Sequence, residues 1–521
     1  MKGMNELNLK AVRDEAMKLH FQHALDLLNP YSLQELGFEG ILLKTKILRG
    51  TYSYAGALEL ALVAVGAASD RKEALQAMME QARCLFALNR SEEALQILQP
   101  IADDEKISAD YPDLYKEARM QTALICSEIG RVEEALGLVK AAATDENLEE
   151  ASEEKIRKAV DTLCLMGDLF SYKSSMPGNG QDAWFTLAQD AYDIALNTCM
   201  LLPESDFRSL RLGLIYNNRA DLFEGLELYE IAGSDYENAL NQVMPIEDPQ
   251  IFDLNGYKAD MLMSLGNFFS LKEDEASALR FLEQAQSLIE EIYNPQQESY
   301  LAKCLYLKGM CRLYSSEDAA QDDLEKSCAL YEKLVSEGRD KSERLANARF
   351  YLAGVLSDSR ENMERKRKLY SQVLPVFERI WQRNPQLYLS NMAALYNDLG
   401  RLCYFQNDPD GALKDYQEGQ ELYQELYTLD PDDLFALYNL VVTRFNIITA
   451  SFRLPQEGLG GLHLKLALEE LNQLRERTED YDPEIWSLLS ASRETLSAQL
   501  PEAMKDYDAL LNDLKLDEYQ A

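Results

Sequence analysis

Residues 265–285 read LGNFFSLKEDEASALRFLEQA, and the order of small and large residues in this stretch decides the fold. Gly266 is followed twelve residues later by Ala278, and then by Leu282 and Ala285 at helical spacing. Small residues let two helices approach closely, while large apolar residues at positions i, i+3, i+4 and i+7 fill the gaps between them. The stretch therefore predicts two helices packed as a hairpin.

The same pattern recurs at four other places in the chain. Each copy places an alanine twelve positions after a small residue, pairing Ala82 with Ala94, Ala123 with Ala135, Ala220 with Ala232 and Gly400 with Ala412. One match would be weak evidence, but five in one chain predict an all-α protein in which helical hairpins stack on one another.

Residues suited to helix ends separate the predicted helices. Asn89, Gly130 and Asn407 fall between paired helices, where a left-handed backbone is wanted. Prolines follow the second helix of several pairs, where they stop it, at Pro245, Pro295, Pro385 and Pro431.

This order of residues resembles the tetratricopeptide repeat, W-x2-L-G-x2-Y…A-x3-F…P, over most of the chain. The spacing departs from that family. Ala94 and Ala135 lie 41 residues apart, and Ala232 and Ala278 lie 46 apart, whereas the usual period is about 34. The units are therefore more similar to the long repeats of kinesin light chains than to short chaperone-docking repeats.

The resemblance implies a right-handed superhelical solenoid of about nine or ten hairpins in one continuous domain over residues 1–500. The clearest units span 77–145, 210–295 and 390–430. Residues 171–181, SYKSSMPGNGQ, are expected to form an exposed loop insertion. Residues 501–521 place apolar side chains on one face of a helix and acids on the other, which suits a capping helix.

The net charge of the chain limits which classes of partner it can bind. The formal net charge is −37, so most of the surface repels nucleic acid and anionic membranes. The acids either serve as a solubilising surface or attract a basic partner. No apolar signal segment follows the first residues, and the most apolar stretch, 57–68, is shorter than the roughly 20 residues that span a bilayer. We expect a cytoplasmic protein whose eight cysteines are free thiols.

Few residues suit catalysis. The three histidines are His20, His23 and His463. The first two share a helical face, but no cysteine or carboxylate pair beside them completes a metal site. A serine or cysteine nucleophile would lack a base, and the glycine-containing stretches 177–180 and 458–461 lack the lysine of a phosphate-binding loop. We expect no enzymatic activity, no cofactor and no metal.

Asparagine follows an aromatic residue in three of the predicted first helices. These residues are Asn217 and Asn218 after Tyr216, Asn397 after Tyr396, and Asn439 after Tyr438. The resemblance implies that this position lies near the concave groove, where an asparagine amide can hold the backbone of an extended peptide. Further candidates for this face are Asn267, Arg401, Thr443 and Asn446. Alternatively, these side chains are solvated or bond a neighbouring helix.

A basic region stands out in the acidic chain. Residues 339–384 hold eleven Lys or Arg against six Asp or Glu, including the run Arg365, Lys366, Arg367 and Lys368. This run is a solvated helix face, a docking patch for an acidic partner, or one side of a clasp with an acidic segment of the same chain.

The sequence as a whole predicts a scaffold or adaptor that binds a partner protein or an extended peptide in the concave groove. Two alternatives remain: a peptide-sensing regulator, and a non-catalytic subunit that holds a separate enzyme. No nucleic acid or membrane partner is expected, and self-association stays open.

Overall fold

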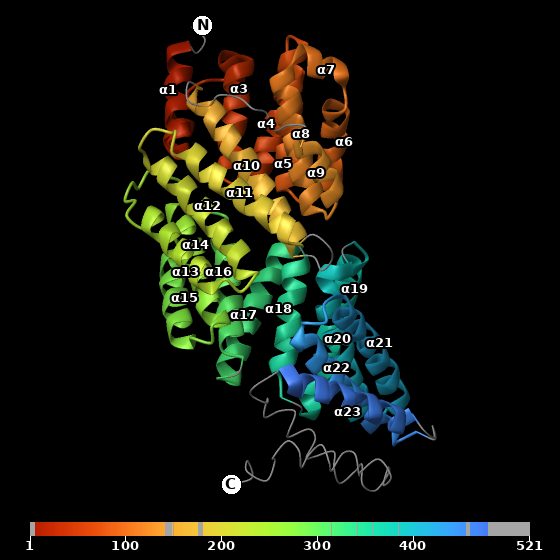
Figure 1. Cartoon of the computed structure of the whole chain (residues 1–521). Helices are drawn as coiled ribbons and strands as arrows, with labels where there is room; N and C mark the ends of the chain where they lie inside the picture. The colour runs from red at the N-terminus through yellow and green to blue at the C-terminus, as the bar shows by residue number, and fades with distance from the viewer. Residues whose placement is uncertain are drawn as a thin grey trace. The chain divides into compact units, whose positions relative to one another are not determined.

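The computed structural model describes residues 6–140, 148, 151–175, 181–313, 315–340, 342–357, 359–383, 385–454 and 459–477. The described residues form α-helices and connecting turns, without a strand among them (Figure 1). They fall into two units, the first ending at Ala348 and the second beginning at Arg349. The predicted all-α solenoid of helical hairpins is confirmed.

Unit 1 is a row of helical hairpins in which the two helices of each hairpin pack against each other. Its eight described hairpins pair α1 (Glu6–Met17) with α2 (Phe21–Leu28), α3 (Leu33–Gly50) with α4 (Tyr54–Ala67), α5 (Arg71–Ala87) with α6 (Ser91–Ala102), α8 (Pro112–Glu128) with α9 (Val132–Lys140), α10 (Glu153–Ser174) with α11 (Gln181–Cys199), α12 (Asp206–Glu224) with α13 (Tyr229–Val243), α14 (Leu254–Leu271) with α15 (Glu275–Glu290), and α16 (Gln297–Cys311) with α17 (Glu317–Ser336). A short helix, α7 (Glu105–Asp110), packs on α8.

Unit 2 continues the same pattern. The helix α18 (Ser342–Val355) begins in unit 1 and ends in unit 2, where Phe350 contacts Tyr370 and Phe377 of α19 (Arg360–Arg383). Two hairpins follow, α20 (Pro385–Phe405) with α21 (Pro409–Leu429) and α22 (Leu434–Ser451) with α23 (Leu459–Arg477). That the array runs unbroken through both units stays a prediction.

The spacing of small and large residues explains the packing inside a hairpin. A β-carbon on Gly266 would lie 2.8 Å from Cγ of Leu282, and one on Gly400 would lie 2.5 Å from the ring of Tyr416. Each large residue comes sixteen positions after its glycine and fills the space that the missing side chain leaves. The predicted pairs of positions therefore meet across the hairpin.

The predicted turn residues adopt the left-handed backbone. Asn89, Gly130 and Asn407 have φ angles of 58°, 83° and 61°, and each follows the first helix of its hairpin. The predicted loop 171–181 is wrong at its start, because α10 continues to Ser174. Residues 176–180 and the expected capping helix, 501–521, lie outside the described residues.

One helix is apolar enough to draw attention. By length and composition alone, α22 could cross a membrane, the single such helix found among the described residues. However, 61% of it is buried inside the protein. It packs against α21 and α23, and Leu437, Val441 and Phe445 join a core with residues of α23. We therefore interpret α22 as the core helix of unit 2.

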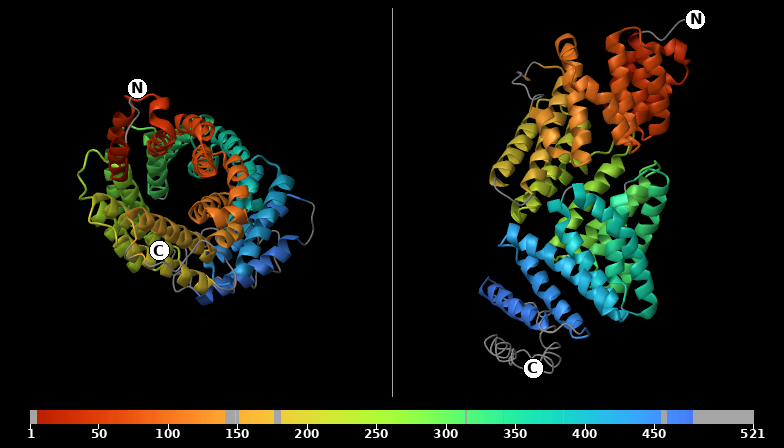
Figure 2. Two further views of the ribbon diagram at one scale, coloured as in Figure 1. Left: turned by 90° about the horizontal axis from the view of Figure 1, so that it is seen from above. Right: turned by 90° about the vertical axis from the view of Figure 1, so that its right-hand side faces the viewer.

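A contact between distant parts of the chain closes unit 1. The turn between α1 and α2 lies against the segment that joins α13 to α14, which Figure 2 shows as red beside yellow-green. The backbone N–H of Phe252 donates to the carbonyl of Leu19 at 3.0 Å, and the rings of Phe21 and Phe252 lie 6.0 Å apart. The Tyr52 hydroxyl donates to Asp253 at 2.7 Å.

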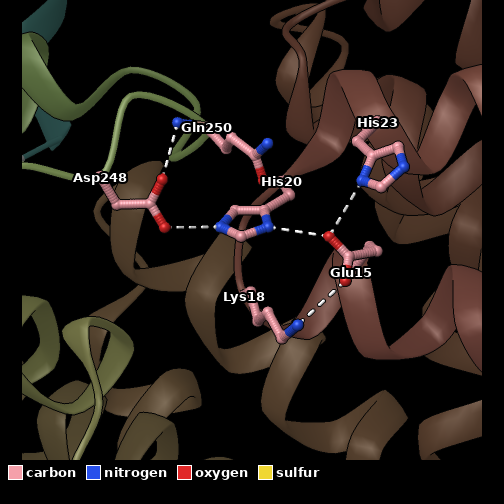
Figure 3. Close-up of polar contacts among 6 residues, drawn as sticks. All are labelled: Glu15, Lys18, His20, His23, Asp248 and Gln250. Atoms are coloured by element: carbon pink, nitrogen blue, oxygen red, sulfur yellow. Dashed lines mark hydrogen bonds and ion pairs between the residues drawn. The ribbon is translucent and has the colours of Figure 1, made fainter.

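His20 lies at the centre of this contact, which we name the latch, formed by residues 15–21, Tyr52 and residues 248–253 (Figure 3). Its Nδ1 lies 2.8 Å from Glu15 Oε2, and its Nε2 lies 2.9 Å from Asp248 Oδ2. The ring is buried. Both contacts are hydrogen bonds when the imidazole carries both protons, because a carboxylate only accepts.

Candidate functional site

A groove with a volume of about 980 Å³ runs along unit 1. Its lining comes mainly from α5, α8, α10 and α12, which are the first helices of successive hairpins and contact one another in that order. The second helix α11 adds Ile194 and Thr198 at one side. Clefts of this size between helices are common ligand sites in helical proteins.

Ion pairs fix one wall of the groove. The buried carboxylate of Glu80 contacts Arg49 and Arg83, and Arg83 also donates to Glu117 at 2.7 Å. Lys158 lies 3.1 Å from the other oxygen of Glu117. Burial alone would raise the pKa of Glu80, but the guanidinium groups of Arg83 and Arg49 lower it to about 2. Lys158 also lies 3.3 Å from Glu154, so three cations face three carboxylates and leave little net field for a charged ligand.

The rest of the groove's charge is also balanced. Asp161 of α10 forms an ion pair with Arg211 of α12. The acidic and basic residues of the lining are equal in number: Asp113, Glu117, Glu154, Asp161 and Asp168 against Arg83, Lys116, Lys155, Lys158 and Arg211. In a chain with a net charge of −37, this lining is locally neutral.

Asn218 provides the hydrogen-bonding group of the groove that is best placed for a ligand. Its Nδ2 donates to Asp168 Oδ1 at 3.1 Å, and the hydroxyl of Tyr192 donates to the same oxygen at 2.6 Å. Burial raises the pKa of Asp168, although the two hydrogen bonds oppose the shift. The contact with Asp168 orients the amide. Its second N–H and its carbonyl oxygen have no hydrogen-bond partner among the described residues.

Apolar side chains line the groove beside this amide. Leu124 of α8 and Ile194 of α11 are exposed, and Met120, Leu163 and Leu214 contribute further apolar surface. Exposed apolar groups around a few oriented polar groups are typical of a binding site for an amphipathic or uncharged ligand.

The asparagines predicted in unit 1 have three different environments. Asn218 lines the groove. Asn217 is buried, and its side-chain oxygen Oδ1 has no hydrogen-bond partner within the described part of the chain. Asn267 is half-buried on α14, outside the lining of the groove.

The predicted residues of unit 2 mostly bond to their own unit. Asn446 donates to Asn397 at 3.0 Å, so the structure brings these two predicted residues together across α20 and α22. The buried hydroxyl of Thr443 donates to the carbonyl of Asn439 at 2.7 Å, and Asn439 donates to that of Phe435. Arg401 forms an ion pair with Asp398 at 3.4 Å. A role for this group in ligand binding stays a prediction.

The predicted basic patch is smaller than expected. Arg365, Arg367 and Lys368 are exposed on α19, but Lys366 is only 2% exposed and cannot meet a docking partner. A run of four residues covers the whole circumference of a helix, so one member must turn toward the core.

The histidines bind side chains of the protein. His20 and His23 both contact Glu15, and His463 lies beside Arg444 in the core of unit 2, where burial and that guanidinium lower its pKa to about 4. Among the described residues, no group of three or more potential ligands is placed to hold a metal ion.

Sequence reasoning missed Asp168, Leu124 and Ile194. A usable signal was present for the two apolar residues, since each lies next to a buried alanine at a packing position, Ala123 or Ala195. Consecutive residues of a helix point about 100° apart. A residue next to a buried alanine therefore projects away from the hairpin core.

Comparisons with known proteins find only distant structural similarities. No family model and no curated protein matches the chain. Among solved structures, BtubC (BKLC) from P. vanneervenii is 17% identical, with 49% of this chain and 94% of that chain covered and a TM-score of 0.37. The apo quorum sensor NprR from B. thuringiensis is 15% identical, covers 71% and 97%, and has a TM-score of 0.45. A Rap protein complexed with competence and sporulation factor is 11% identical, covers 78% and 100%, and has a TM-score of 0.40.

All three TM-scores are below 0.5 and all three identities are below 25%, so these structures establish neither a family nor a ligand for this chain. The hairpins themselves place the chain in a class: it is an all-α helical-repeat protein.

Proposed function

We propose that the chain is an interaction protein, a scaffold or adaptor, that holds an extended peptide segment of a partner in the groove of unit 1. The observation that supports this most is Asn218, whose amide is oriented by Asp168 and keeps a donor and an acceptor for a ligand. An extended backbone offers an N–H and a C=O to such an amide, and neither contact depends on the side chains of the peptide.

The free energies of the available contacts indicate what kind of peptide can bind. A hydrogen bond to Asn218 would contribute about 0.5–1.5 kcal/mol, whereas micromolar binding needs about 8 kcal/mol. Burial of one large apolar side chain contributes about 1.5–3 kcal/mol. The ligand is therefore an extended segment that places at least two apolar side chains near Leu124 and Ile194. Since the acidic and basic residues of the lining are equal in number, the segment carries little net charge.

The wider role follows from the earlier expectations. The long repeat spacing supports a resemblance to kinesin light chain repeats, and the acidic composition disfavours a nucleic acid or membrane partner. The adaptor we propose is cytoplasmic. The proposal assigns no step of bond chemistry to this chain.

Paired variants test the groove. Peptides selected from a phage-displayed library on the full chain are measured by fluorescence anisotropy. Ile194→Lys should weaken binding at least tenfold, because it places a charge among the apolar contacts. Leu187→Lys on the same helix should leave binding unchanged, because Leu187 is similarly exposed, 43% against 51%, but lies outside the groove.

A second pair tests the amide. Asn218→Ala should weaken the same peptides about threefold to tenfold, as the loss of one or two hydrogen bonds predicts. Asn241→Ala on α13 removes an equivalent exposed amide outside the groove and should have no effect. Equal losses in all four variants, or in none, would remove the groove from consideration.

The latch favours a second candidate, a peptide-sensing regulator. The groove helices α5 to α12 lie between the two ends of the latch along the chain. A peptide that changes the pitch of these hairpins would act on the latch, and opening the latch would in turn change peptide affinity by the same factor. In a regulator, Asp248→Ala alters both the affinity and the small-angle scattering change on peptide addition. In a static adaptor, it alters neither.

A further inference from the structure

We infer that unit 2 carries a second ligand site, which binds an acidic peptide segment that contains an apolar side chain. The site is a concave surface with a volume of about 950 Å³, lined by one face of α19 and by the end of α20, and we name it the α19 pocket. It shares no residue with the groove of unit 1, and the inference does not depend on the proposed function.

The basic side of the α19 pocket comes from helical spacing. Glu364, Arg367, Lys368 and Ser371 recur every three or four residues, which places them on one face of α19. Lys366 is buried on another face. Arg367 and Lys368 are exposed, and no carboxylate among the described residues forms an ion pair with either of them. Two cations at consecutive positions of one helical turn can therefore bind an incoming anionic group.

The apolar side of the pocket is an aromatic ring left open to solvent. Phe405, the last residue of α20, is 55% exposed. Its neighbour Tyr404 contacts it edge-on at 6.1 Å and is covered by the guanidinium of Arg453 at 3.9 Å. Met363, nearly buried on α19, adds a thioether to the lining. A ligand's apolar side chain that covers Phe405 and Met363 removes this surface from water, which favours binding.

The balance of charge favours a peptide carboxylate over a nucleic acid. Arginine binds carboxylates with two parallel hydrogen bonds, and lysine adds a point charge. Nucleic acid binding draws its strength from a series of phosphate contacts. The α19 pocket offers two cations beside Glu364, and the chain around it has a net charge of −37. A short acidic segment can meet the two cations without lying along the acidic surface.

The test uses the full chain and three fluorescein-labelled ten-residue peptides. The first contains Asp and Glu with one central Phe, the second replaces this Phe by Ser, and the third replaces the acids by Asn and Gln. Anisotropy at about 50 mM salt should show binding of the first peptide, with at least fivefold weaker binding of the other two. Raising the salt to 300 mM should weaken the first peptide, because the contacts are between exposed charges.

Matched variants assign the binding to the α19 pocket. Arg367→Gln combined with Lys368→Gln should weaken the first peptide at least tenfold, whereas Arg365→Gln, on the same helix but outside the pocket, should not. Phe405→Ser should weaken it about fivefold. Phe435→Ser is the control, since Phe435 is 62% exposed on α22 and lies outside the pocket. Circular dichroism and melting temperatures show whether each variant is folded.

Three results would overturn the inference: equal binding of the acidic and amide peptides, equal loss in Arg365→Gln and in the pocket variant, or tighter binding of single-stranded DNA than of the first peptide. Ile194→Lys in unit 1 leaves this binding unchanged if the two sites are separate, so a failure of the groove proposal can be told from a failure here.

Discussion

At Gly400, the absence of a side chain sets how closely the two helices of a hairpin pack. The ring of Tyr416 occupies the space that a β-carbon on Gly400 would take. Such a β-carbon would lie 2.5 Å from the nearest ring atom. Tyr416 is buried, and Gly419 of the same helix contacts the backbone of α20 in the same way. The packing of α20 against α21 therefore depends on a contact that no other residue type permits.

Gly400→Ala should lower the free energy of unfolding by about 1–3 kcal/mol, because the added methyl group displaces the ring of Tyr416. Gly354→Ala in α18 is the matched control. A β-carbon there meets no atom within 4 Å, so the change should be neutral or stabilise by up to about 1 kcal/mol through helix propensity. Urea denaturation followed by circular dichroism measures both. Equal effects would mean that the close approach is absent in solution.

The consecutive residues Asn217 and Asn218 show how much of the site could be predicted from the sequence. The spacing of small and large residues identifies which face of a helix packs inside its own hairpin, and Gly266 with Leu282 confirms it. It does not determine how the next hairpin approaches. Asn217 and Asn218 were both predicted for the groove, yet the first is buried and the second lines the groove. Consecutive residues of a helix point about 100° apart. The spacing of small and large residues does not show which of two consecutive side chains faces the groove.

At the scale of the element, helices and turns were largely predictable because their causes are local. The left-handed turns at Asn89, Gly130 and Asn407 need only the turn residue and its two flanking helices. The extent of α10 was not predicted, because the polar run that begins at Ser171 looked like a loop. The latch could not be predicted, since His20 and Asp248 are 228 residues apart and no periodicity connects them.

The latch predicts a pH dependence of stability. Hydrogen bonds from His20 and Lys18 lower the pKa of Glu15 to about 2, and the backbone N–H of Gln250, with His20, lowers the pKa of Asp248. Lys18, His23 and Asp14 also lie beside this cluster, and the Arg157 guanidinium donates to the carbonyl of Met17 in the same turn at 3.1 Å. A carboxyl group with a lowered pKa in the folded state stabilises fully above its unfolded value, and this contribution is lost as the pH falls toward the folded value. For Glu15, this window runs from about 4.5 down to about 2.

Asp248→Ala should therefore cost about 1.5–3 kcal/mol at pH 6, the typical contribution of a hydrogen bond to a charged group, and less at pH 3, because the pKa of Asp248 is lowered in the folded state. The adjacent, exposed Glu247→Ala is the control and should cost little at either pH. Urea denaturation of the wild-type protein and both variants at the two pH values measures the difference. A cost for Asp248→Ala that does not fall in acid would contradict the ionic account of the latch.

At the scale of the whole molecule, composition and repeats predicted the class of protein but not its sites. The net charge of −37 describes the whole chain, whereas the lining of the groove is locally neutral because its acidic and basic residues are equal in number. The α19 pocket differs again, since Arg367 and Lys368 carry no ion pair among the described residues. Such local balances depend on which side chains meet across hairpins, and the linear sequence leaves that open.

The latch also bears on the order in which the protein is made. Most hairpins of a repeat protein can pack as soon as the next one leaves the ribosome, because each contacts only its neighbours. The turn at His20 differs, because its partner Asp248 comes 228 residues later. At about 5–20 residues per second, the first hairpin waits on the order of ten to fifty seconds. During that time Phe21 and Tyr52 lack their contacts with Phe252, and the nascent chain exposes an aromatic surface that a chaperone can recognise.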